Sequence, residues 1–287
     1  MPHWTVLPRP GNRRDLLGEG ICYVARENAL FWVDILGQRL HRRGLDDDAY
    51  AEWDMPDLIG WVIERADAPG FVAGLRSGFH TLTLDPFALE PIGHPEPDLA
   101  GNRMNDAVAD RHGRIWAGTM SMDGNRDSGA LYRLDPDMTW MRADGPYRIA
   151  NGPAIAPDGR TLYHTDSARG VVYRFAIDEA GQLGPRETFV AFPDAWGSPD
   201  GMTTDSEGGV WIAHWGGGCV SRFTPDGQRE RWIDLPASQI TRPCFGGPQL
   251  DRMFVTSAAD GVDEAMAGCV FEIDPGARGV PAHRFGG

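Results

Sequence analysis

The sequence lacks any long hydrophobic run. Across its 287 residues no apolar stretch approaches the roughly 18 residues that a membrane-spanning helix needs. The charges within the first fifteen residues are not followed by the apolar segment of a signal peptide. We therefore expect a cytoplasmic protein without a membrane partner.

Positive charge is also scarce. Lys and Arg number 27 against 41 Asp and Glu, which gives a formal net charge of −14. A protein that binds a polyanion needs a basic face. The composition therefore argues against nucleic acid as a partner.

Cysteine is rare, and several familiar catalytic motifs are missing. Cys22, Cys219, Cys244 and Cys269 are scattered without a CxxC pair, so neither a zinc site nor a disulfide framework is predicted. No GxSxG or HExxH motif occurs, which disfavours a serine nucleophile elbow and a zinc protease. We interpret the four thiols as buried and free.

What the chain has in abundance is glycine and proline, 37 and 22 residues, which disfavours a mainly helical fold. Short aromatic or β-branched strands recur six times between turns, and each is followed by a second strand that begins near a glycine. Their central residues lie 40 to 48 positions apart, at Trp32, Val72, Trp116, Tyr163, Trp211 and Phe254. This repeat predicts an all-β fold, a six-bladed β-propeller of four-stranded antiparallel blades, as one domain over residues 1–287.

A propeller ring has to be closed. We expect the strand-like segment His3 to Leu7 to supply the outermost strand of the last blade, whose own C-terminal strand would lie near Pro281 to Phe285.

The repeat also places candidate ligands. Glu19, Asn105, Asn151 and Asp200 lie 13, 11, 12 and 11 residues before the central residue of their blades, at the start of the strands that would line the central channel. Two carboxylates and two amide oxygens that face one point would repel one another without a cation. We expect one divalent metal ion. Oxygen ligands favour calcium, magnesium, manganese or iron(II) over a structural zinc.

Each of these residues has a simpler interpretation. Pro-Asp-Gly is a turn motif and occurs three times, with Asp158, Asp200 and Asp226 at its centre. Only Asp200 lies in the ligand register, so Asp158 and Asp226 are predicted to be turn residues. Asn105 and Asn151 could bond their own backbone in loops, and the shared register is what favours a ligand role. His164 and His214 are predicted to be core or rim residues.

Several motifs occur in an order that resembles a known family. They are Gly18-Glu19-Gly20, WVDI at 32–35, RMNDAVAD at 103–110 leading into GRIWAGTM at 113–120, NGPAIAPDG at 151–159, SPDGM at 198–202 and PCFGG at 243–247. Together they resemble the SMP-30/gluconolactonase/regucalcin family over about residues 15 to 275. SGALYRLD and YHTDS look most like its bacterial sugar lactonases of the pentonolactonase kind, such as xylonolactonase.

The resemblance implies a six-bladed propeller with one divalent ion held by Glu19, Asn151 and Asp200. The candidates for that ion are calcium, iron(II), manganese, magnesium and zinc. Asn105 and Arg103 match substrate-binding residues of the family, and Asp123 falls where the family has a longer glutamate. Asp200 matches the family's proposed proton acceptor and donor, and activation of a metal-bound water is the competing account. Ile21 replaces a common proline.

The expected activity is therefore metal-dependent hydrolysis of a sugar aldonolactone, a pentono- or hexono-lactone, to the aldonic acid. The expected partner is the small sugar lactone, and the protein is expected to be a monomer or a weak homo-oligomer. Two alternatives stay open. One is a propeller hydrolase of another ester, an aryl ester or a phosphotriester. The other is a non-enzymatic calcium-binding propeller.

Overall fold

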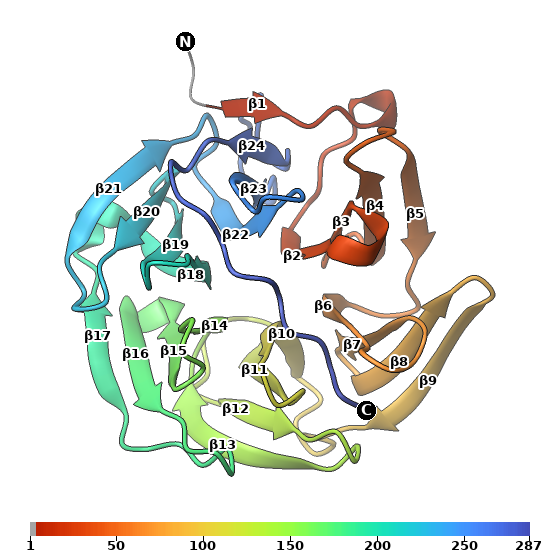
Figure 1. Cartoon of the computed structure of the whole chain (residues 1–287), viewed down its shortest axis with the longest axis vertical. Helices are drawn as coiled ribbons and strands as arrows, with labels where there is room; N and C mark the ends of the chain where they lie inside the picture. The colour runs from red at the N-terminus through yellow and green to blue at the C-terminus, as the bar shows by residue number, and fades with distance from the viewer. Residues whose placement is uncertain (1–3) are drawn as a thin grey trace.

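The computed structural model describes residues 4–287 and shows six four-stranded antiparallel sheets arranged around a central axis (Figure 1). Blade 1 consists of β2 (Gly18–Val24), β3 (Ala29–Asp34), β4 (Arg39–Gly44) and β5 (Tyr50–Asp54); blade 2 of β6 (Ile59–Glu64), β7 (Phe71–Leu75), β8 (Gly78–Leu84) and β9 (Phe87–Gly93); blade 3 of β10 (Asn102–Ala109), β11 (Ile115–Ser121), β12 (Gly129–Leu134) and β13 (Trp140–Tyr147).

Blade 4 consists of β14 (Ala150–Ile155), β15 (Thr161–Asp166), β16 (Val171–Ala176) and β17 (Glu187–Ala191); blade 5 of β18 (Ser198–Thr204), β19 (Val210–Trp215), β20 (Cys219–Phe223) and β21 (Arg229–Asp234); blade 6 of β22 (Ile240–Gly246), β23 (Arg252–Ser257), β24 (Phe271–Ile273) and β1 (Trp4–Val6). The predicted all-β propeller is confirmed. The central residue of each sequence repeat lies on the second strand of its blade.

The helical elements between residues 4 and 287 are single turns of 3₁₀ helix, and none has the length of a membrane span. They are η1 (Pro10–Asn12), η2 (Ala25–Glu27), η3 (Ser167–Arg169) and η4 (Asp194–Trp196).

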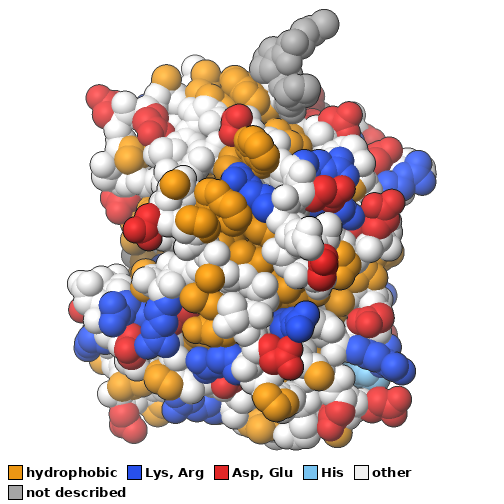
Figure 2. Space-filling model, turned by 90° about the vertical axis from the view of Figure 1, so that its left-hand side faces the viewer, with side chains coloured by type: hydrophobic (Ala, Val, Ile, Leu, Met, Phe, Trp, Pro, Cys, Tyr) orange, Lys and Arg blue, Asp and Glu red, His pale blue; other side chains and the backbone are white. Residues whose placement is uncertain are grey.

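Adjacent blades are held together by hydrophobic side chains, with one buried cluster at each of the six blade interfaces. Inner and middle strands are buried on both faces, whereas β21 alternates between half-buried and exposed residues. Its Trp232 is 56% exposed, the highest value among the large hydrophobic side chains. On the flank of the ring formed by β17 and β21, acidic, basic and hydrophobic side chains are interspersed (Figure 2).

The N-terminal strand closes the ring as predicted. β1 pairs with β24 in antiparallel register, from Trp4 opposite Ile273 to Val6 opposite Phe271. His3, the first residue of the predicted segment, lies outside the described residues.

The predicted C-terminal strand of the last blade near Pro281 to Phe285 is wrong. The third strand of blade 6 is β24, and the place beyond it is already taken by β1. After β24 the chain leaves the sheet at Asp274 and Pro275, and proline has no N–H to continue a ladder.

Instead, the C-terminal segment, residues 278–287, runs across one face of the ring (Figure 1). Arg278 accepts a hydrogen bond from Ser206 N (2.7 Å), and Phe285 N donates to Glu64 O (2.9 Å). Gly286 N donates to Gly113 O (3.0 Å). These partners lie at the end of the inner strand of blade 2 and just after the inner strands of blades 5 and 3, so the C-terminal segment covers the face at which the inner strands end.

Candidate functional site

Every inner strand contains one extra residue at the same level of the channel, as its pairing with the second strand shows. In β2, Glu19 pairs with Val33 but Cys22 pairs with Phe31, and equivalent shifts occur in β6, β10, β14, β18 and β22. Such β-bulges turn side chains out of the sheet pattern. The six axial bulges, as we call them, lie where the candidate ligands were predicted.

The bulges explain why the four candidates shared only an approximate register. Glu19 and Asn151 are the last paired residues before their bulges. Asn105 and Asp200 are the first residues within theirs. Two adjacent strand positions, the last residue before a bulge and the first residue within it, therefore reach the same channel.

Asn105 connects two blades in this cluster. Its Nδ2 donates to Asn151 Oδ1 at 2.8 Å and to the carbonyl of Ala150 at 2.8 Å. Arg103 Nη1 donates to Asn105 Oδ1, and Asn151 Nδ2 donates to Ser167 Oγ at 3.0 Å. The amide oxygens and nitrogens are therefore held in defined orientations.

Glu19 and Asp200 are deeply buried acids, each 3% exposed. Burial raises the pKa of Asp200 well above its usual range, and the charge of Glu19 raises it further. Burial also raises the pKa of Glu19, against the opposing effects of a Gly20 N–H bond and of the charges of Arg242 and Arg103. Both shifts reflect the free energy cost of two negative charges in a poorly hydrated space.

Arg103 is the cationic neighbour of this acid pair. Burial lowers its pKa to about 10, although the charges of Glu19 and Asp200 oppose that shift. The guanidinium therefore stays charged at neutral pH.

The donor set fits a divalent cation. Asp200 Oδ1 is buried and has no hydrogen-bond partner among the described residues, although a buried carboxylate oxygen is normally paired. Glu19, Asn151 and Asp200 would supply oxygen ligands of the type that hard cations prefer. Within residues 4–287 no three His, Cys, Asp or Glu side chains gather into a metal cluster, so a cation here would need an amide ligand beside the two acids.

Asp123 is not brought into the buried cluster. It lies in the loop between β11 and β12 with a side chain that is 52% exposed, 3.6 Å from Arg126. Its pKa is lowered chiefly by a hydrogen bond from Asn125 N. An aspartate is one methylene shorter than the expected glutamate, and here it caps its own turn.

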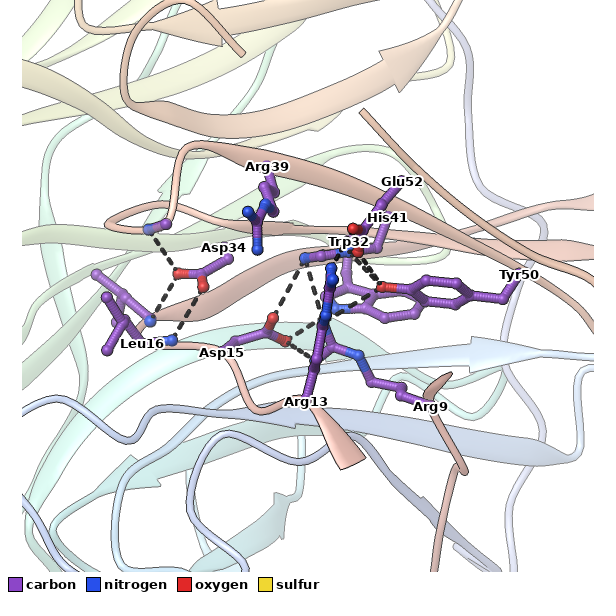
Figure 3. A network of polar contacts seen from close by, with 12 residues as sticks. Arg9, Arg13, Asp15, Leu16, Trp32, Asp34, Arg39, His41, Tyr50 and Glu52 are labelled. Atoms are coloured by element: carbon purple, nitrogen blue, oxygen red, sulfur yellow. Dashed lines mark hydrogen bonds and ion pairs between the residues drawn. The ribbon is translucent and has the colours of Figure 1, made fainter. Parts of the chain in front are cut away.

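Two aspartates that sequence reasoning did not single out hold the segments leading into the strands that carry the candidate ligands Glu19 and Asn151. Asp34 accepts hydrogen bonds from the backbone N–H groups of Leu16 and Leu17, each at 3.0 Å (Figure 3). Asp166 accepts equivalent bonds from Arg148 N and Ile149 N, at 3.1 and 3.3 Å. The feature of the sequence that could have identified them is the aspartate next to the end of the WVDI and YHTDS motifs.

A second network fixes the chain just before Glu19 (Figure 3). Asp15 accepts a hydrogen bond from Trp32 Nε1 at 3.0 Å and forms an ion pair with Arg9 at 2.7 Å. His41 Nε2 lies 3.2 Å from Asp15 Oδ1, and its Nδ1 lies 2.9 Å from the Tyr50 hydroxyl. The segment that leads to Glu19 is therefore anchored to blade 1 at Asp15, through Trp32 and His41, and at Leu17, through Asp34.

The fold and this cluster define a six-bladed propeller with buried carboxylate and amide side chains gathered in its channel. Residues 17–259 match the family model of the SMP-30/gluconolactonase/LRE-like region. The chain belongs to this family, which confirms the predicted resemblance.

Relatives and solved structures agree with that placement. The chain is 35% identical to a 6-deoxy-6-sulfogluconolactonase of Pseudomonas putida, with 89% of this chain and 90% of that protein covered. It is also 35% identical to a pentonolactonase of Haloferax volcanii, with coverages of 93% and 94%. The solved structure of a calcium-binding protein, regucalcin, from Agrobacterium tumefaciens superposes with a TM-score of 0.92 at 27% identity, covering 98% and 96% of the two chains.

Proposed function

We propose that this protein is a metal-dependent lactonase that hydrolyses a sugar aldonolactone to the aldonic acid. The observation that carries the proposal is the buried acid pair of Glu19 and Asp200, with an unpaired Asp200 oxygen. Arg103 and Asn105 lie beside it. The names of the relatives, a sulfogluconolactonase and a pentonolactonase, support the same reaction class.

Glu19, Asn151 and Asp200 would hold the cation. When bound, a divalent ion supplies Lewis-acid stabilisation for negative charge that develops on the lactone carbonyl oxygen. Oxygen ligands suit calcium, magnesium, manganese and iron(II), and the related calcium-binding structure favours calcium among them.

The protein side chains orient the sugar and move the proton. Arg103 and the amide of Asn105 would donate hydrogen bonds to the sugar hydroxyls or the carbonyl oxygen and so fix its orientation. Asp200 would accept a proton from the attacking water as the new C–O bond forms. It would then return that proton to the ring oxygen as the ester C–O bond breaks.

Asp123 would act at the mouth of the site if it contacts substrate, because its side chain is exposed on the loop after β11. The polar surroundings of Glu19 and Asp200 favour a polyhydroxylated substrate over an aryl ester or a phosphotriester. We further propose a cytoplasmic, monomeric or weakly self-associating protein.

The test is to measure the metal content of the purified protein, strip the metal with a chelator, and restore single ions. Acid release from pentono- and hexono-lactones is then followed, with spontaneous hydrolysis subtracted. We expect turnover that depends on the restored ion. A metal-binding protein that shows no rate above background with any lactone would favour the non-enzymatic calcium-binding alternative.

A further inference from the structure

Arg242 reaches across the channel from blade 6 to blade 3, although the proposed reaction gives it no role. It lies in the axial bulge of β22. Its Nη1 forms an ion pair with Asp106 Oδ1, and its Nη2 donates to the carbonyl of Ala107 at 3.1 Å. Asp106 and Ala107 are on β10, on the opposite side of the axis (Figure 1).

The path of Arg242 passes directly beside the acid pair. A Cβ atom at Gly201 would lie 2.7 Å from Arg242 Cβ, so only a glycine next to Asp200 leaves room for this side chain. Gly201 directly follows Asp200, so the aliphatic part of the Arg242 side chain crosses the channel beside that carboxylate. The guanidinium is therefore an electrostatic neighbour of the site, and its side chain is only 11% exposed.

Asp106 connects the ion pair to the metal ligands. It is fully buried, and its Oδ2 accepts a hydrogen bond from Gly152 N at 3.0 Å. Gly152 follows Asn151 directly. Arg242 and Asp106 thus form an ionic bridge across the channel between the two sides of the site.

The bridge changes the charge balance of the channel. Glu19, Asp106 and Asp200 contribute three negative charges, and Arg103 and Arg242 contribute two positive ones. With a divalent ion the set carries one net positive charge, whereas without Arg242 it would be neutral. A cation whose charge is incompletely neutralised binds its ligands less tightly and polarises an oxygen more strongly.

We propose that Arg242 is a positioning residue that keeps the channel cation incompletely neutralised, weakening ion binding and strengthening stabilisation of the oxyanion. This inference depends on the proposed function.

A double-mutant cycle of Arg242 and Asp106 tests this proposal, with Ca²⁺ affinity measured by calorimetry and chelator competition. Arg242→Met should bind Ca²⁺ at least about tenfold more tightly, since one unit charge near a divalent ion is removed. Asp106→Asn, which keeps an acceptor oxygen for Gly152 N, should bind at least about tenfold more weakly. The double variant restores the charge balance and should lie within about threefold of the wild type.

Kinetics with the best pentonolactone provide a second readout. Arg242→Met should lower kcat by about tenfold while KM stays within about twofold, because the charge acts on the transition state. The matched control is Arg252→Met with Glu272→Gln, which removes an ion pair of the same blade at 2.6 Å and should leave Ca²⁺ affinity unchanged.

The outcomes distinguish a failure of the inference about Arg242 from a failure of the proposed metal site. Unchanged or weaker Ca²⁺ binding by a folded Arg242→Met protein overturns the inference. If Arg242→Met fails to fold, the double variant decides the question. Ca²⁺ binding by the double variant that is as weak as that of Asp106→Asn also overturns the inference. A wild-type protein that binds no divalent ion would overturn the metal site itself, and this inference with it.

Discussion

The three Pro-Asp-Gly aspartates show how position decides the role of a residue. Asp158 and Asp226 are exposed, and they accept hydrogen bonds from Arg160 N and from Thr224 Oγ1 within their own turns. Asp200 is buried beside Glu19. The repeat register distinguished the buried Asp200 from the two exposed turn residues, because the distance from the blade's second strand fixes which turn lies at the channel.

Asp200→Asn should lose bound metal and nearly all lactonase activity, because one of the two proposed acidic ligands loses its charge. Asp158→Asn is the matched control in an exposed turn and should retain both. Metal content and acid release measure the result. A metal-free Asp200→Asn protein with full activity would contradict the proposed scheme.

Arg103→Ala should separate substrate recognition from metal binding. Arg103 donates to Asn105 and is not among the proposed ligands, so the variant should keep its metal. We expect kcat/KM to fall by about a hundredfold or more, as for the loss of a charged hydrogen-bonding group. Loss of metal from this variant would argue that Arg103 instead maintains the cation site.

The acid pair also predicts how metal stabilisation depends on pH. The folded-state pKa values of Glu19 and Asp200 are raised. In the metal-free protein, the two protonated acids stabilise the fold at pH values below their pKa in the unfolded chain. That contribution is lost as the pH rises through their pKa values in the folded protein. A bound cation removes this cost.

The rise in melting temperature on adding Ca²⁺ should therefore be larger at pH 7.5 than at pH 5. Ligand at about 100 times its Kd contributes about 2.7 kcal/mol, which corresponds to several degrees for a chain of this size. Calorimetry with and without metal at both pH values measures it. An equal rise at the two pH values would show that the acid pair does not govern metal stabilisation.

At the scale of the strand, the sequence predicted the blades but not the axial bulges. The spacing of Trp32, Trp116 and Trp211 was enough to place the second strands, since alternation and turn residues repeat with the blade. The bulges follow from contacts between neighbouring blades. A Cβ atom at Gly152 would lie 2.5 Å from the carbonyl oxygen of Asp200, and no local pattern in the sequence records that approach.

Asp34 and Asp166 went unnoticed for a related reason. Their hydrogen bonds reach backwards along the chain to Leu16 and Leu17, and to Arg148 and Ile149. Aspartate is common at the ends of strands as a turn residue. Only the arrangement of blades shows that these two orient the segments before Glu19 and Asn151.

Gly152→Ala should be strongly destabilising, by about 2 kcal/mol or more, because strain adds to a steric clash. Gly152 has φ +37° and faces the Asp200 carbonyl, whereas Gly261 has φ +73° and no described atom near its Cβ position. Gly261→Ala therefore measures the strain of a positive φ without a steric clash, and it should lower the free energy of unfolding by about 1 kcal/mol. Urea unfolding of both variants checks this, and equal losses would show that the clash is relieved by a small shift.

At the scale of the whole molecule, the sequence predicted the closing strand but misplaced the end of the chain. β1 pairs with β24 as expected, while Phe285 lies across the ring against blade 2. It is fully buried in the cluster between blades 2 and 3. A single phenylalanine near a terminus, after two prolines, has no strand pattern from which its place could be predicted.

Phe285→Ala should lower the free energy of unfolding by about 3–5 kcal/mol, the usual range for a buried phenylalanine. Exposed Phe87, 47% exposed on β9, provides the control, and Phe87→Ala should change stability little. Denaturant unfolding with both variants measures the difference. Equal stability of the two would mean that the C-terminal segment is dispensable for the ring.

The pairing of β1 with β24 also bears on how the protein is made. Trp4 and Ile273 lie at opposite ends of the chain, so the first strand leaves the ribosome long before its partner exists. Until residue 273 has been synthesised, both edges of the growing sheet array stay unpaired and open to association with other strands. Ring closure therefore has to wait for β24, and the unpaired strand edges of the partly synthesised chain stay exposed to association until then.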